Sequence, residues 1–134
     1  MKMQPVPIEW VHRAWTDAAP FIASALEYAH DGFTVEQAKV LVASGEWRLL
    51  VGVANDEVRG AMTVKFFNRT NDRVALVTAI GGRHVATRDC FEQLREFAVE
   101  NGATVLEGAV RDSLARAWKH FGLEKKAVIV GVKL

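Results

Sequence analysis

Three nearly apolar stretches follow one another between residues 47 and 80, and only short polar turns separate them. Residues 47–54 and 74–80 are almost continuously apolar, as strands covered on both faces are. Residues 58–67 lie between them, after an Asn55-Asp56 turn signal. Connections this short join only antiparallel neighbours, so this region predicts the antiparallel half of a β-sheet.

Helices and strands alternate after residue 80. A Gly81-Gly82 break precedes a helical pattern over residues 87–101, followed by a strand over 104–110. A last helix follows Asp112 or Ser113, and a β-branched strand is expected over 127–132. The strand–helix–strand unit predicts a right-handed parallel crossover. The expected fold class is therefore α/β with a mixed (α+β) sheet and helices on both faces.

Two helices are predicted before the sheet. Residues 6–11 are either an edge strand or the lead-in to a helix that Asp17 caps and Gly32 ends. Thr34 and Gln37 have the spacing of a capping box, which predicts a second, short helix that Gly45 stops.

Composition narrows the class of protein. A chain of 134 residues suits one domain over residues 1–134, and its formal net charge of +1 disfavours a nucleic-acid partner. No apolar run reaches the ~20 residues of a membrane span, and no signal peptide is recognisable, so we expect a cytoplasmic protein without a membrane partner. The only cysteine, Cys90, reads as a small buried hydrophobe in a reducing compartment. No residue spacing resembles a zinc site, and we predict no metal.

The order of elements resembles that of the GNAT N-acetyltransferases over nearly the whole chain. Gly81-Gly82-Arg83, followed by a helix that ends near Gly102-Ala103, is similar to the loop and helix with which that family holds the acyl-CoA pyrophosphate. Residues 114–123 are similar to its late helix. A further set of residues resembles small GNAT-like proteins encoded by bacteriophages and prophages: Gly45, Trp47, Leu49, Gly60, Ala61, Gly81, Gly82, Arg83, Glu107, Gly108, Arg111, Lys133 and Leu134.

The resemblance implies acetyl-CoA, or another acyl-CoA, as cofactor. The residues that would bind it are Ala79, Ile80, Gly82, Arg83, His84, Val85, Ala86 and Thr87. Val85 and Thr87 stand where the family loop has glycines, and their Cβ atoms would obstruct a phosphate. Thr87 would alternatively donate a hydrogen bond from its hydroxyl or cap the helix. The alternative to a cofactor-binding loop is that Gly81-Gly82 forms only a turn or bulge and that the Arg83 side chain is exposed to solvent.

The family's catalytic positions are also altered. The late helix carries Trp118 where many of these enzymes have a proton-donating tyrosine, and Trp118 falls on an apolar stripe typical of core packing. Glu107 interrupts an apolar strand, so it is either the general base or half of a structural ion pair with Arg111 or another cation. Tyr28, Phe33 and Arg111 are the predicted substrate-binding residues.

Two functions follow from the resemblance. The first is acetyl transfer from acetyl-CoA to a primary amine of a small molecule or a protein. The alternative is a catalytically inactive phage protein, in the host cytoplasm or the virion, that binds a phage or host protein in a virion-associated or host-takeover role. The family chain usually ends in two strands and this one has room for a single strand, so an open sheet edge would favour strand exchange and a homodimer.

Overall fold

The computed structural model describes residues 1–134 and contains one five-stranded sheet in the order β1-β2-β3-β4-β5. The strands are β1 (Lys2–Pro5), β2 (Trp47–Ala54), β3 (Glu57–Asn68), β4 (Arg73–Gly82) and β5 (Val105–Gly108). The first four pair antiparallel, whereas β4 and β5 pair parallel. The predicted mixed sheet is confirmed.

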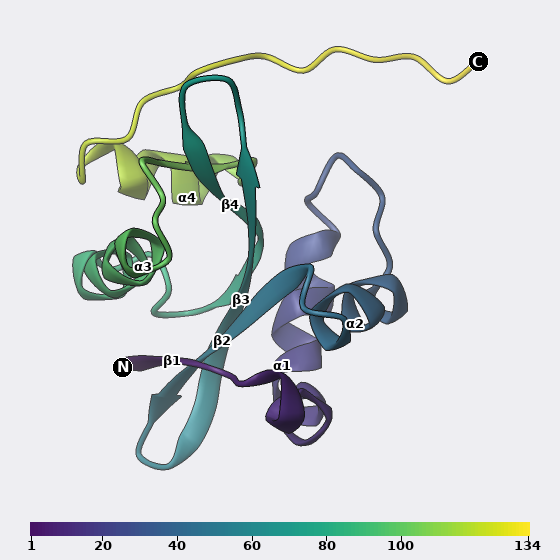
Figure 1. The fold of residues 1–134 in the computed structure, drawn as a ribbon, viewed down its shortest axis with the longest axis vertical. Coiled ribbons are helices and arrows are strands. Elements are labelled where there is room, and N and C mark those ends of the chain that lie inside the picture. The colour runs from purple at the N-terminus through teal and green to yellow at the C-terminus, as the bar shows by residue number, and fades with distance from the viewer.

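Helices cover both faces of this sheet, also as predicted. They are a 3-10 turn (Ile8–Trp10), α1 (Val11–Leu26), α2 (Val35–Ala43), α3 (Arg88–Glu100) and α4 (Asp112–Lys119). Figure 1 shows α1 and α2 on one side of the sheet and α3 and α4 on the other. Each pair encloses its own apolar core against the sheet. None of the helices combines the length and apolarity that a membrane crossing requires.

Local signals place several boundaries where the sequence predicts them. The Thr34 hydroxyl accepts a hydrogen bond from the Gln37 amide, and the Gln37 side chain accepts one from the Thr34 amide, which is the capping box of α2. Asn55 and Asp56 have φ values of 52° and 62°, the left-handed conformation of a tight hairpin turn between β2 and β3. These features need only residues close in the chain.

The first helix is longer at its start than predicted and ends earlier. It begins at Val11, so Asp17 and Pro20 lie inside it, and it ends at Leu26 rather than at Gly32. Its buried residues recur at helical spacing: Val11, Trp15, Ala18, Ile22 and Leu26. Burial of this stripe offsets the lost hydrogen bond of Pro20, about 3 kcal/mol in a helix interior. The edge strand β1 lies before residues 6–11, which form the lead-in to α1.

The prediction of a strand over residues 127–132 is wrong. That segment forms no ladder, and its apolar side chains are exposed. Figure 1 shows it leaving α4 and running past the turn between β3 and β4, away from the body of the molecule. A β-branched sequence does not form a strand until another strand accepts its hydrogen bonds.

Gly81 and Gly82 do not break β4. The strand continues through both residues, which pair with Ala61 and Gly60 of β3. A Cβ on Gly81 would lie 2.3 Å from the carbonyl oxygen of Phe21 in α1. The absence of a side chain at Gly81 therefore lets α1 approach the sheet, a packing role that neither a turn nor a bulge describes.

Candidate active site

Strand β4 contains an irregularity at Thr78. Val77 pairs with Val64 and Ala79 with Thr63, which leaves Thr78 as the extra residue of a β-bulge. The parallel pairing with β5 ends at Val77, so β4 runs on to Gly82 without a neighbour on that side. A bulge bends its strand, and this one coincides with the divergence of the two parallel strands. The freed edge of β4 can hydrogen-bond to another molecule.

Two threonines hold the bulge in place. The Thr78 hydroxyl donates to the Thr63 carbonyl at 3.1 Å, and the two hydroxyl oxygens lie 2.7 Å apart. Thr63 is fully buried. Because each hydroxyl is satisfied by the other residue, these polar groups can be buried in the sheet without the cost of an unpaired donor.

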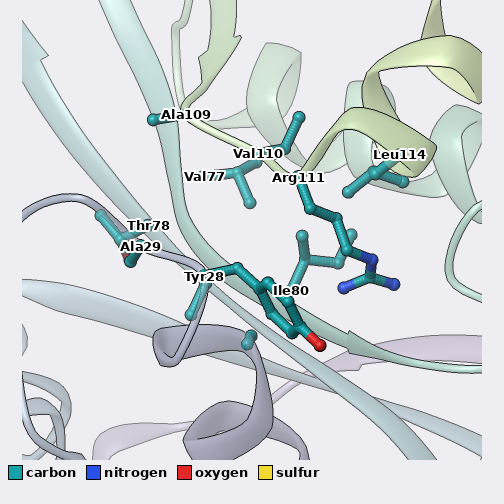
Figure 2. Close-up of a pocket in the computed structure, with 11 residues that line it drawn as sticks. Tyr28, Ala29, Val77, Thr78, Ile80, Ala109, Val110, Arg111 and Leu114 are labelled. Atoms are coloured by element: carbon teal, nitrogen blue, oxygen red, sulfur yellow. The ribbon is translucent and has the colours of Figure 1, made fainter. Parts of the chain in front are cut away.

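A pocket lies at this divergence, between the freed part of β4, the turn after α1 and the chain that follows β5 (Figure 2). The space there, about 310 Å³, includes open solvent, so the pocket is a shallow depression. Its lining is mostly apolar: Ala25, Tyr28, Ala29, Val77, Thr78, Ala79, Ile80, Ala109, Val110, Arg111 and Leu114. Figure 2 shows the Tyr28 ring and the Arg111 side chain reaching toward the same side of the pocket.

Four of the predicted site residues line this pocket, whereas Phe33, also predicted to bind substrate, does not. Ala79 and Ile80 of the expected cofactor strand line it together with Tyr28 and Arg111. Phe33 packs edge-on against Trp47, with ring centroids 5.0 Å apart, in the core beneath α1 and α2. Because α1 ends at Leu26, the following turn brings Tyr28 to the pocket.

The side chains of the loop over residues 82–87 differ in how deeply they are buried. Val85 is 1% exposed and belongs to the core between α3 and the sheet, so its Cβ points inward and not into solvent. Thr87 is the N-cap of α3: its hydroxyl accepts from the Cys90 amide at 3.2 Å and donates to the His84 carbonyl at 3.0 Å. The helix-cap alternative for Thr87 is confirmed.

The loop backbone leaves several donors available. The amides of His84, Val85 and Ala86 donate no hydrogen bond within the chain, and they directly precede the N-terminus of α3. Ala86 is partly buried, whereas the side chains of Arg83 and His84 are exposed. Consecutive free amides beside a helix N-terminus and a cationic side chain can hold a phosphate.

Glu107 forms an ion pair, and its partner is another cation than Arg111, as the prediction allowed. Both its carboxylate oxygens accept from Arg69, at 2.5 and 2.8 Å. These hydrogen bonds, with the charges of Arg69 and Lys126, hold the pKa of Glu107 below its usual value. Glu107 does not line the pocket, and a lowered pKa makes a weaker base. The geometry favours the structural alternative, and Arg111 instead bonds Ser113 through Nε at 3.1 Å.

Trp118 packs in the core, as its apolar stripe predicts. It is 3% exposed, and its ring centroid lies 6.2 Å from that of Phe91. A Cβ on Gly108 would come within 3.1 Å of the indole ring, so β5 and α4 approach each other closely here. The buried indole N–H has no hydrogen-bond partner.

Sequence reasoning missed other pocket residues. Thr78 is a polar residue in the otherwise apolar stretch 74–80, and that interruption was the one signal that pointed to the bulge. Ala25, Val110 and Leu114 carry no such signal, because apolar pocket residues have the same pattern as core residues.

Comparison with known proteins supports the fold. No family model matches the sequence, and no curated protein is similar to it. Solved structures are similar over nearly the whole chain. They include a ribosomal-protein-alanine N-acetyltransferase from Brucella melitensis biovar Abortus 2308, with a TM-score of 0.71, 14% identity and full coverage of both chains. The aminoglycoside acetyltransferase meta-AAC0020 from an uncultured soil metagenomic sample has a TM-score of 0.69 and 11% identity, with 99% of this chain and 95% of that one covered. The chain therefore has the GNAT acetyltransferase fold.

Proposed function

We propose that this protein is an acyl-CoA-dependent N-acyltransferase that transfers an acetyl group from acetyl-CoA to a primary amine. The observation that carries the proposal is the divergence of β4 from β5 at the Thr78 bulge. It frees a strand edge that begins at a pocket and leads into a loop with free amides. One extended ligand with a phosphate group fits these three features together.

The cofactor would lie along the freed edge of β4. The backbone of Ala79 and Ile80 would bond its amide-containing arm, and the amides of His84 and Ala86 would bond its pyrophosphate. Arg83 is exposed beside these amides and would add a positive charge. The side chain of Val85 points into the core, so its Cβ would not obstruct a phosphate at the exposed Arg83 and His84.

The amine would enter the pocket between Tyr28 and Arg111. A bound acyl-CoA would supply the activated acyl group: the amine nitrogen would form the new C–N bond while the thioester C–S bond breaks, and CoA would leave as its thiolate, which takes a proton from solvent. The guanidinium of Arg111 disfavours a second positive charge nearby, so it would lower the pKa of the amine and favour its neutral, nucleophilic form. No carboxylate or imidazole lines the pocket. The proton is therefore expected to pass to water, with positioning supplying most of the rate.

Calorimetric titration with acetyl-CoA tests the cofactor site. We expect binding that Arg83→Ala weakens about tenfold, the effect of losing one charge-assisted contact of about 1.5 kcal/mol. Arg13→Ala is the matched control, because Arg13 is an exposed arginine at the start of α1. Absence of binding at millimolar acetyl-CoA by folded protein would exclude the acyltransferase.

The second candidate is a binding module that keeps the fold without catalysis. The absence of an ionisable base from the pocket and the burial of Trp118 favour it. A screen of primary amines with acetyl-CoA, read by release of free thiol, separates the two candidates. Cofactor binding without thiol release from any amine would support the binding module.

A further inference from the structure

Residues 124–134, here termed the apolar arm, are unpaired and exposed. Five of its large apolar side chains are each at least 65% exposed: Val128, Ile129, Val130, Val132 and Leu134. No other segment exposes as many large apolar residues. A contiguous apolar stretch of this kind normally marks an interaction site, and its β-branched composition suits an added strand.

Strand β5 offers an edge that fits such a segment. It hydrogen-bonds to β4 on one side and has no strand on the other. A groove of about 690 Å³, which includes open solvent, lies beside it. Leu106 of β5 lines this groove with Phe91, Phe121 and Leu123. An added strand would place alternate side chains in the groove and satisfy the free backbone groups of β5.

The opposite edge of the sheet is less suitable. Strand β1 is as short as β5, but it carries Lys2 and Pro5, and Pro7 follows shortly after it. Lysine and proline on an edge strand are the residues that block further pairing. Of the two outer edges of the sheet, that of β5 is therefore the one that can accept the arm.

The arm begins beside the β5 of its own chain but does not join it. Lys126 is close enough to Glu107 for its charge to act on that carboxylate, yet no hydrogen bond links the arm to β5. The following residues run away from the body (Figure 1). Eleven extended residues span about 36 Å, enough to reach a neighbouring molecule.

We propose that the apolar arm of one copy pairs with the free edge of β5 in a second copy, and that the second copy returns its own arm in the same way. The exchange is two-fold symmetric, so each arm fills the other copy's groove and the assembly closes as a dimer. The reciprocal contact buries both arms and both open edges. It involves neither the pocket nor the loop over residues 82–87, so it stands or fails independently of acyl transfer.

Light scattering on the full chain, with hydrogen exchange of the same sample, tests the proposal. We expect a dimer mass, with slow exchange of the amides of residues 105–108 and 127–132. The double variant Ile129→Asp, Val130→Asp should halve the mass and remove that protection. Val40→Asp and Val99→Asp are matched controls at valines 67% and 61% exposed on α2 and α3, and both should stay dimeric.

Each other outcome overturns the proposal. A monomer with a protected arm would mean that the arm folds back onto its own β5. A monomer with an unprotected arm would mean that the arm has no partner of its own kind. A dimer that survives the double aspartate substitution would place the interface elsewhere. Circular dichroism of every variant confirms that the exposed substitutions leave the fold intact.

Discussion

At the scale of single residues, polar side chains inside strands mark the places where the structure is specialised. Thr78 and Glu107 both interrupt apolar sequence, and each has a distinct partner, Thr63 and Arg69 respectively. The sequence identifies such residues because burial of a polar group requires a partner. It does not identify the partner, which for Glu107 lies 38 positions away.

The Glu107–Arg69 ion pair predicts a pH-dependent stability. Folding lowers the pKa of Glu107. The ion pair therefore stabilises the folded state fully above the pKa of the unfolded chain, about 4.3. That stabilisation is lost as the pH falls through the pKa of the folded state. Glu107→Gln should lower the melting temperature at pH 7. The difference from the unsubstituted protein should disappear in melts near pH 3.

Glu57→Gln is the control for this prediction, because Glu57 pairs with Arg59 across an exposed surface. It should leave the melting temperature unchanged at both pH values. If Glu107→Gln melts like the unsubstituted protein at pH 7, or if the difference persists at pH 3, the ion pair is not stabilising. Should acyl transfer be found, its loss in Glu107→Gln would restore Glu107 as the base.

At the scale of elements, the sequence predicts strands and helices where local patterns suffice. Strand β2 has the predicted limits, and α2 begins at its capping box. The limits of α1 were missed because its stripe from Val11 to Leu26 is stabilised by the sheet and α2, which lie far along the chain. Packing of an amphipathic face contributes more to a helix than its end signals do.

The contact of α1 with β4 depends on Gly81. Gly81→Ala would place a methyl group 2.3 Å from the Phe21 carbonyl oxygen, so helix or strand must shift. We expect a loss of about 1–3 kcal/mol in the free energy of unfolding, the range for overpacked sites. Urea denaturation measures it. Gly131→Ala, in open space, should cost almost nothing, and equal stability of the two variants would refute the close contact.

At the scale of the whole molecule, two separate cores lie on the two faces of one sheet. Cys90 belongs to the core between α3 and the sheet and is 1% exposed. Burial, followed by the charge of Asp89, raises the pKa of its thiol. Since the thiolate is the reactive form, the native thiol should be inert, in agreement with the predicted buried hydrophobe.

Thiol labelling of the native protein tests this core. We expect Cys90 to react with an aromatic disulfide only at the rate at which the molecule unfolds, and at once in denaturant. A Cys90→Ser, Val99→Cys variant presents its thiol at an exposed position of the same helix and should react immediately. Rapid labelling of native Cys90 would show that this core opens without unfolding.

The sequence by itself determined the hairpins that join β2, β3 and β4 and the capping box of α2, because each depends on a turn or a cap within a few residues. Only the tertiary structure decided that β4 leaves β5 at Thr78, that Val85 points inward and that Glu107 meets Arg69. It also decided that the segment over residues 127–132 finds no strand partner. These outcomes depend on contacts between residues far apart in the chain, which local patterns do not encode.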